Sequence, residues 1–245
     1  QDCLSSVALE CAKECGVLVR IAHSHNSNQD KNIKYIMKQH YRKKIPQFAT
    51  ELFACGKDAG DWMFTGHRYK ILYNAINTSV YTYSFEKAVT IREKLHVEQN
   101  LVIGHVGRFD AQKNHTFLLD IFSECVNIVP NARLLLVGDG EGRTQIQEKA
   151  KSLGLEEKVI FTGVRNDVAD LLQAMDVFVF PSLYEGVPVT MIEAQASGLP
   201  CVISDGVPKD CVITSGLVTS MKLSDRPCDW AKHIAAQLNR KRENH

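Results

Sequence analysis

Runs of consecutive apolar residues alternate along the chain with segments in which apolar positions recur every three or four residues. The first pattern is typical of parallel strands buried on both faces, and the second of helices that pack on a sheet. The apolar runs lie at residues 17–22, 52–55, 101–106, 133–137, 158–161, 177–180 and 200–203. Strands that alternate with helices over short turns predict an α/β fold with a doubly wound parallel sheet.

The helices are indicated by their apolar stripes and by the residues at their ends. Residues 114–129 carry apolar side chains on one face, and the stripe stops at Pro130, which does not continue a helix. Pro188 suits the first position of a helix because it has no amide to leave unpaired there. The predicted helices are 3–15, 114–129, 142–153, 167–175, 188–197 and 228–240.

The spacing of these elements predicts two domains of unequal completeness. Residues 98–240 supply about five strand–helix units, which is enough for one whole Rossmann-like domain, so we assign 76–245 to it. Residues 1–75 contain two predicted strands, too few for an independent domain of this class, so we expect part of a second, N-terminal domain there. Because the chain opens inside a helical pattern, we expect it to be a fragment of a longer protein.

Charge and hydropathy exclude several classes of partner. The 29 Lys and Arg residues nearly balance the 28 Asp and Glu residues, giving a net charge of +1, so a nucleic-acid-binding role is not expected. No apolar run reaches the roughly 18–20 residues that a membrane span needs. The short basic cluster at residues 41–44 has two interpretations: a solvated helix face, or a peripheral contact with an anionic lipid or an acceptor phosphate.

The cysteines favour a reducing compartment. The chain has 8 of them and no Cys-x-x-Cys pair, so neither a zinc site nor a thioredoxin-type motif is indicated. Several lie inside apolar runs, where a free cysteine behaves as a small hydrophobic residue. We therefore expect reduced thiols and a cytoplasmic protein.

The first candidate for chemistry is the segment that follows the apolar run 101–106. Gly107 would allow a ligand to approach the backbone closely, and Arg108 and Lys113 bring two cations to the end of a buried strand. Lys113 also stands just before a predicted helix, whose N-terminus favours anions. Open α/β sheets bind ligands beyond the carboxyl ends of their strands, so the segment is a candidate phosphate site. The alternative is two exposed loop cations.

The second candidate follows the run 177–180. A loop carries Glu185, and the amides of Gly186 and Val187 precede the helix that Pro188 begins, an arrangement suited to a pyrophosphate oxygen. Glu193 lies about one and a half turns into that helix, among apolar neighbours where a charge without a role is unusual. Two carboxylates that flank an anion-binding turn could hold the hydroxyls of two sugars.

Taken in order, Gly107-Arg108-x4-Lys113 and Glu185-x7-Glu193 resemble the donor domain of glycosyltransferase family 4. The resemblance extends over nearly all of residues 17–205. Further segments that agree are 161–168, 137–140, 71–77, in which Asn77 replaces the usual Asp, and 20–26, which is similar to the acceptor-domain His segment of capsular and exopolysaccharide transferases. The family implies a GT-B fold, with two Rossmann-like domains, and a retaining hexosyl transfer. Its members are longer than this chain, which implies a truncated N-terminal half that can leave the fragment inactive.

The resemblance also implies roles for the donor-site residues. Arg108 and Lys113 would bind the donor diphosphate and stabilise the departing nucleotide charge, and Glu193 would hold the ribose hydroxyls. The backbone around Val164 and the side chain of Arg165 would meet the base.

The remaining implied roles concern the sugar. Glu185 would contact hydroxyls of the donor sugar, with the Gly186 and Val187 amides at the phosphate. From the acceptor side, His23 or His25 would reach the reacting sugar, with His23 preferred over the alternative of a structural histidine.

No metal or other cofactor is expected. Many sugar transferases hold a metal with an Asp-x-Asp motif, and this chain has none. The cations and the helix N-terminus could stabilise the leaving group without a metal. The nucleotide sugar, with UDP as the expected carrier, is a substrate.

The family implies a glycan or polyprenyl-linked acceptor in surface polysaccharide synthesis, at the inner face of the membrane. Two other functions stay open. One is a non-catalytic nucleotide-sugar-binding module that needs a missing N-terminal half, and the other is a GT-B nucleotide-sugar epimerase.

Overall fold

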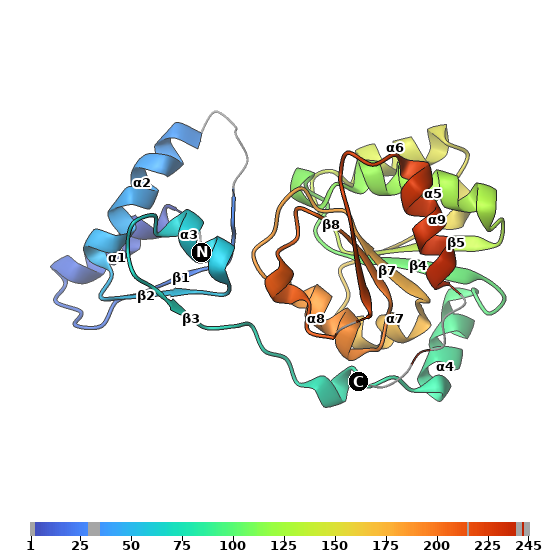
Figure 1. Ribbon diagram of the computed structural model, residues 1–245, viewed down its shortest axis with the longest axis horizontal. Coiled ribbons are helices and arrows are strands. Elements are labelled where there is room, and N and C mark those ends of the chain that lie inside the picture. Colours follow the sequence, from blue (N-terminus) through green and yellow to red (C-terminus); the bar gives the residue numbers. More distant parts are fainter. Residues whose placement is uncertain (1–2, 29–34, 215, 239–241, 243–245) are drawn as a thin grey trace. The chain divides into compact units, whose positions relative to one another are not determined.

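The structure is a computed structural model that describes residues 3–28, 35–214, 216–238 and 242. By their contacts the residues form two compact units. The first comprises Gln1–Ala75, Tyr184–Pro188 and Pro208–Cys211; the second comprises Ile76–Leu183, Val189–Val207 and Val212–His245. Each contains a parallel sheet with helices (Figure 1).

The first unit is a small α/β layer. Its sheet has the order β1-β2-β3, formed by β1 (Ile21–Ser24), β2 (Glu51–Ala54) and β3 (Lys70–Ile71), all parallel. Its helices are α1 (Ser5–Glu14), α2 (Tyr35–Phe48) and α3 (Lys57–Met63). The core gathers residues from these elements, among them Leu9, Ala22, Ile45, Met63 and Phe64.

The strand predicted at 17–22 begins later than expected. Pairing with β2 starts where Ile21 lies opposite Glu51, and the side chain of Leu18 is 86% exposed. The apolar run could not indicate this, because a strand begins where its neighbour offers backbone partners. The two-residue β3 was not predicted, since Lys70–Ile71 forms no apolar run.

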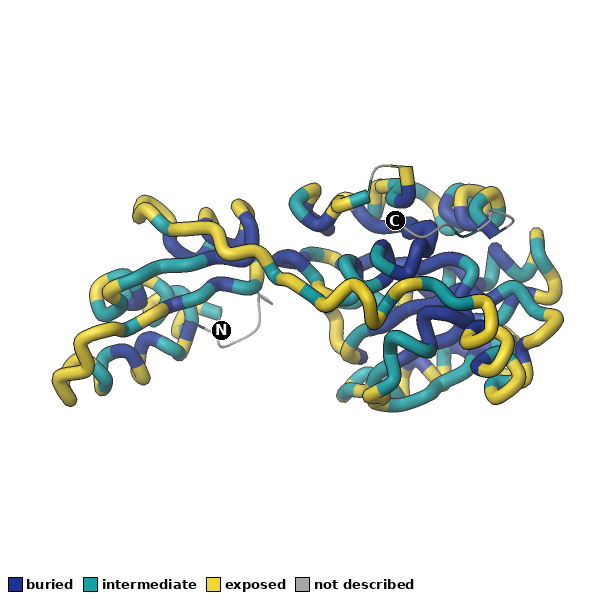
Figure 2. Tube along the Cα trace, turned by 90° about the horizontal axis from the view of Figure 1, so that it is seen from below, coloured by how far each residue is buried: buried dark blue, intermediate teal, exposed yellow. Residues whose placement is uncertain are grey.

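The second unit contains a doubly wound sheet of six parallel strands in the order β6-β5-β4-β7-β8-β9. The strands are β4 (Leu101–Val106), β5 (Ala132–Val137), β6 (Val159–Gly163), β7 (Val177–Phe180), β8 (Cys201–Ser204) and β9 (Val218–Met221). The central strands are almost entirely buried, as Figure 2 shows. The predicted doubly wound parallel sheet is confirmed. Strand β9 was missed, because its polar Thr219 and Ser220 interrupt the apolar run at the sheet edge.

Helices cover both faces of this sheet (Figure 1). On one side lie α5 (His115–Ile128), α6 (Arg143–Ser152) and α9 (Pro227–Gln237); on the other lie α4 (Phe85–Leu95), α7 (Val168–Ala174) and α8 (Val189–Ala196). The predicted helices agree with the observed ones to within a few residues, except that the end predicted for the last helix, 239–240, falls outside the described residues. Helix α4 was not predicted, although Ser84 caps it by accepting from the Lys87 amide.

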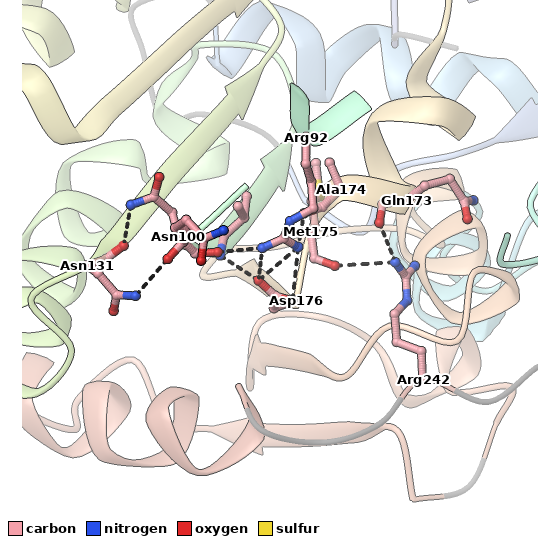
Figure 3. A network of polar contacts seen from close by, with 10 residues as sticks. Arg92, Asn100, Asn131, Gln173, Ala174, Met175, Asp176 and Arg242 are labelled. Carbon is pink, nitrogen blue, oxygen red and sulfur yellow. Dashed lines mark hydrogen bonds and ion pairs between the residues drawn. The ribbon is translucent and has the colours of Figure 1, made fainter. Parts of the chain in front are cut away.

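Two partly buried arginines, Arg92 and Arg242, bind carboxylate and carbonyl groups of the second unit (Figure 3). Arg92 of α4 pairs with Asp176 at 3.2 Å, and Asp176 in turn accepts from the Val102 amide at 2.7 Å. Arg242 donates to backbone carbonyls at the ends of α7 and α8, including those of Gln173 at 2.8 Å and Ser197 at 2.7 Å. Burial lowers the pKa of Arg242 to about 10. These contacts satisfy carbonyls that helix ends leave without intrahelical partners.

Candidate donor site

The sheet of the second unit reverses its order between β4 and β7, which are neighbours although two other strands separate them in the chain. Ligands of open α/β sheets bind beyond the carboxyl ends of the strands at such a switch point. The loop with Arg108 and Lys113 leaves β4 here, and β7 leads through residues 181–188 to α8, which carries Glu193. The topology therefore brings the two candidate segments of the sequence to adjacent strands.

Neighbouring turns hold the loop after β4 in one conformation. The Gly107 amide donates to Val137 O at 2.9 Å, and the Phe109 amide donates to Asp139 O at 3.0 Å. Gly138 has φ +134°, and a Cβ there would overlap the carbonyl of Gly107. Only glycine satisfies both conditions, so the predicted glycine turn at 137–140 supports the cationic loop from below.

Lys113 ends a short 3-10 helix, Ala111–Lys113, that Asp110 caps: the Lys113 amide donates to Asp110 Oδ1 at 3.1 Å. The Lys113 ammonium lies 4.7 Å from the centroid of the Phe180 ring, at the end of β7. This cation–π contact holds the Lys113 ammonium beside the end of β7. Arg108 is exposed in the same loop.

Two hydrogen bonds join this loop to the segment after β7. The Asn114 side chain donates to Pro181 O at 3.2 Å, and the Leu183 amide donates to Gln112 O at 2.8 Å. Asn114 takes a left-handed conformation, φ 55°, at the start of α5. The segments after β4 and β7 therefore form one connected surface at the switch point.

Two buried histidines lie beneath the cationic loop, and sequence reasoning missed them. His105 of β4 and His115 of α5 have ring centroids 4.6 Å apart, and the His105 Nδ1 atom lies 2.9 Å from Val179 O. Burial, and then the nearby Lys113, lowers the pKa of His115 to about 4; burial and His115 lower that of His105 well below its ordinary value. Both rings are therefore neutral. The sequence signal that could have indicated this pair was the polar residue His105 within the apolar run 101–106.

Glu193 also has a partner that the sequence did not indicate. It is half-buried on α8, and its Oε1 accepts a hydrogen bond of 2.7 Å from the hydroxyl of Tyr81. Burial, and then the contact with Glu193, raises the pKa of Tyr81 to about 12. The residues are far apart in sequence, so spacing alone could not have paired them.

The turn after β6 carries the residues predicted to meet the base. Val164 is 76% exposed, while Arg165 forms a bidentate ion pair with Asp167, with N–O distances of 2.8 and 2.6 Å. The Gly138 amide donates to Gly163 O at 2.9 Å, so this turn is tied to the one after β5. The Arg165 side chain is thus held by a carboxylate, whereas Val164 presents its backbone and side chain to solvent.

The other predicted residues belong to the first unit. Glu185 is buried, and its carbonyl accepts from the Ser27 hydroxyl. A Cβ at Gly186 would overlap the carbonyl of His25, so glycine allows the two backbones to approach. Val187 O accepts from the Asn74 side chain at 2.7 Å. The loop predicted to offer free amides is therefore also a packed element of this unit.

His23 and His25 lie on and just after β1, with ring centroids 4.1 Å apart. His23 lines a cavity of about 250 Å³ together with apolar residues that include Leu9, Ile45 and Phe64. Its Nε2 atom is buried and has no hydrogen-bond partner within the described parts of the chain. Burial, and then His23, lowers the pKa of His25.

The residues that the structure describes contain no group of three or more His, Cys, Asp or Glu side chains arranged to hold a metal ion. Among those same residues, no helix is both long enough and apolar enough to cross a membrane.

Residues 100–240 match the sequence model of the family described as glycosyl transferases group 1. The chain belongs to this family. It is 37% identical, over 233 residues, to the "Putative glycosyltransferase EpsF" of Bacillus subtilis (strain 168), covering 91% of this chain and 61% of that protein. It is 29% identical over 150 residues to an Escherichia coli protein named UDP-Gal:alpha-D-GlcNAc-diphosphoundecaprenol alpha-1,3-galactosyltransferase, covering 60% of this chain and 39% of that protein.

Solved structures share the fold of this group 1 family chain. HepE from Anabaena, crystallised with UDP and glucose, superposes with a TM-score of 0.86 at 21% identity, covering 97% of this chain and 66% of that one. Sucrose-phosphate synthase from Thermosynechococcus elongatus superposes with a TM-score of 0.81 at 21% identity, covering 97% of this chain and 63% of that one. The α/β, GT-B-type fold class is confirmed. The chain spans about three-fifths of the length of the Bacillus relative.

Proposed function

We propose that the protein is a retaining glycosyltransferase of family 4, which transfers a sugar from a UDP-sugar to a glycan or lipid-linked acceptor in surface polysaccharide synthesis. One observation carries the proposal: the cationic loop and the helix with Glu193 follow β4 and β7, the adjacent strands at which the sheet order reverses. That is where doubly wound sheets bind nucleotides.

The names of similar proteins support the choice of donor. The Escherichia coli relative is named for a UDP-Gal donor and a diphosphoundecaprenol-linked acceptor, and HepE was crystallised with UDP and glucose. From these names and from the family motif, we infer that UDP carries the donor sugar for this chain.

Charge stabilisation of the leaving group is the central chemical step of the proposal. As the bond between the sugar and the diphosphate breaks, negative charge grows on the nucleotide. Lys113 and Arg108 would neutralise that charge, with no metal ion required. Lys113 is held beside β7 by Phe180, so little reorganisation would be needed when the charge develops.

The remaining roles follow the family motif. Glu193 would hold the ribose hydroxyls, and the exposed backbone near Val164 would meet the base. Because Arg165 is paired with Asp167, it would reach the base only by exchanging that partner. The acceptor would attack the face of the sugar that the diphosphate leaves, which retains the anomeric configuration.

Residues of the first unit would act on the sugar itself. Glu185 would bind donor-sugar hydroxyls, with the Gly186 and Val187 amides at the phosphate. His23 would reach the reacting carbon, and its Nε2 atom, buried and without a partner among the described residues, supports this choice over His25.

A lipid-linked acceptor would place the protein at the inner face of the cytoplasmic membrane. Helix α2 supports that part of the proposal: Ile36 is 82% exposed at one end, and Lys43 is exposed on the same helix. Apolar and basic side chains together favour an anionic lipid surface. Arg42, in contrast, packs on Trp62 with 5.3 Å between guanidinium and ring, so the basic cluster is partly structural.

The proposal is tested by incubating the purified protein with UDP-glucose, UDP-galactose or UDP-N-acetylglucosamine and a polyprenyl-diphosphate-linked sugar, in EDTA. We expect acceptor-dependent release of UDP from one donor, and NMR of the product should show the donor's anomeric configuration. The variant Lys113→Ala should lower the rate by about 100-fold. Inversion at the anomeric carbon would contradict the retaining mechanism, and conversion of the donor without an acceptor would indicate an epimerase.

A further inference from the structure

The segment that leads from residue 75 to helix α4 is joined to α8 by a hydrogen bond. Tyr81 ends the short 3-10 helix Thr78–Val80, and its hydroxyl donates to Glu193 Oε1 at 2.7 Å. The hydrogen bond joins residues 112 positions apart, both in the second unit. A hydrogen bond from a phenol to a carboxylate is charge-assisted and therefore among the stronger side-chain contacts.

The backbone of Tyr81 is itself held in place. The side chain of Gln173, which is buried in α7, donates to Tyr81 O at 3.2 Å and accepts from the Ser84 amide at 3.0 Å. One amide group therefore fixes both ends of residues 81–84. The tyrosine hydroxyl reaches Glu193 from a fixed backbone, so the contact restricts the carboxylate and not merely the tyrosine.

The far end of α8 is fixed as well. The Ser197 hydroxyl donates to Glu193 O at 3.0 Å, and the guanidinium of Arg242 donates to Ser197 O at 2.7 Å. The same guanidinium lies 4.3 Å from the Tyr83 ring and donates to Gln173 O, in the network of Figure 3. Tyr81 and Arg242 thus contact α8 at Glu193 and just after its end, and the Gln173 side chain of α7 holds the backbone of residues 81–84.

We propose that Tyr81 is a positioning residue for Glu193 in nucleotide binding: its hydroxyl occupies Oε1 and orients the carboxylate so that Oε2 accepts from the ribose. This inference rests on the proposed function, in which Glu193 holds the ribose hydroxyls. A glutamate side chain free to change rotamer loses conformational entropy when it binds a ligand. A carboxylate already held by Tyr81 loses less, so the hydroxyl should strengthen binding of the nucleoside part.

The test is calorimetric titration of the purified protein and its variants with UDP and with inorganic pyrophosphate. Tyr81→Phe should weaken the binding of UDP about three- to tenfold, as expected for the loss of one hydrogen bond, and leave the binding of pyrophosphate unchanged. In a Glu193→Ala background the same substitution should have no further effect, because the hydroxyl acts only through the carboxylate. Tyr73→Phe, which alters an exposed tyrosine just before this segment, is the matched control and should bind UDP like the wild type.

The outcomes separate the inference from the proposed function. If Glu193→Ala weakens UDP and Tyr81→Phe does not, the positioning role is wrong and the donor site stands. If Tyr81→Phe tightens UDP, the hydroxyl competes with the ribose, which also overturns the inference. Weaker binding of pyrophosphate in Tyr81→Phe would indicate a general structural role of Tyr81 instead. The same would follow if Tyr81→Phe weakened UDP binding equally in the Glu193→Ala background. If Glu193→Ala binds UDP like the wild type, the ribose role of Glu193 fails and the inference fails with it.

Discussion

The rings of His105 and His115 are neutral and lie beneath the loop that carries Lys113. A positive charge on either ring would repel the lysine ammonium, which contributes to the low pKa of both histidines. The pair therefore fills the space under the cationic loop with aromatic rings: His115 stacks on Phe109 at 4.1 Å between centroids. Neutral rings suit this place because they support the loop without adding charge to it.

These histidines predict an acid sensitivity of the fold. The unfolded chain takes up a proton on His115 near its ordinary pKa of 6.5, whereas the folded chain resists protonation until about 4. The unfolded state therefore binds more protons in this window, and the free energy of unfolding should fall as the pH drops from 6.5 to 4. The contribution of His115 is about 3 kcal/mol across the window.

Urea unfolding at several pH values between 4 and 7 measures this slope. His115→Phe keeps the stacked ring and removes the titrating group, so its slope should be visibly shallower than that of the wild type. His67→Ala, at an exposed histidine, should leave the slope as it is. An identical slope in His115→Phe and wild type would contradict the assignment.

At the scale of elements, strand β4 and its loop depend on the turn after β5. The Gly138 backbone lies against the Gly107 carbonyl with φ +134°, a conformation that side chains disfavour. Both the space and the backbone angle therefore exclude a Cβ. The turn is a structural support for the loop that carries Arg108 and Lys113, although it carries none of the proposed ligand contacts.

Gly138→Ala should consequently destabilise the protein by about 3 kcal/mol and weaken UDP as well, because the loop with Arg108 must shift. Gly154→Ala is the matched control: Gly154 also has positive φ, +68°, but a Cβ there meets open space. Gly154→Ala should lower the free energy of unfolding by about 1 kcal/mol and leave UDP binding unchanged. Thermal unfolding and titration with UDP measure both effects. If the two variants lost equal amounts of stability and of UDP affinity, the contact between Gly138 and Gly107 would be unimportant.

The elements differed in how well their sequence indicated them. The central strands of the second unit, β4, β5, β7 and β8, are buried on both faces, so their apolar runs were sufficient signals. Strands β3 and β9 lie at sheet edges, and their polar residues hid them. The motif residues could be proposed from short-range spacing. The partners of Glu193 and Lys113 could not, because Tyr81 and Phe180 reach them through tertiary packing.

At the scale of the whole molecule, the chain is a member of the group 1 glycosyl transferases. Its second unit contains a sheet with a switch point of its own. Six of the residues proposed to hold the nucleotide belong to that unit: Gly107, Arg108, Lys113, Val164, Arg165 and Glu193. Glu185 and His23 belong to the first unit. Under the proposal, the second unit should therefore largely determine nucleotide binding.

The most direct test of this account is calorimetric titration of the protein with UDP, GDP and ADP in EDTA, for the wild type, Arg108→Ala and Lys113→Ala. Lys151→Ala, at an exposed lysine of α6, is the control. We predict that UDP binds without a metal ion, that each loop variant weakens it at least tenfold, and that the control does not. Binding of UDP with equal affinity in all four proteins, or a strict need for a divalent cation, would contradict the account.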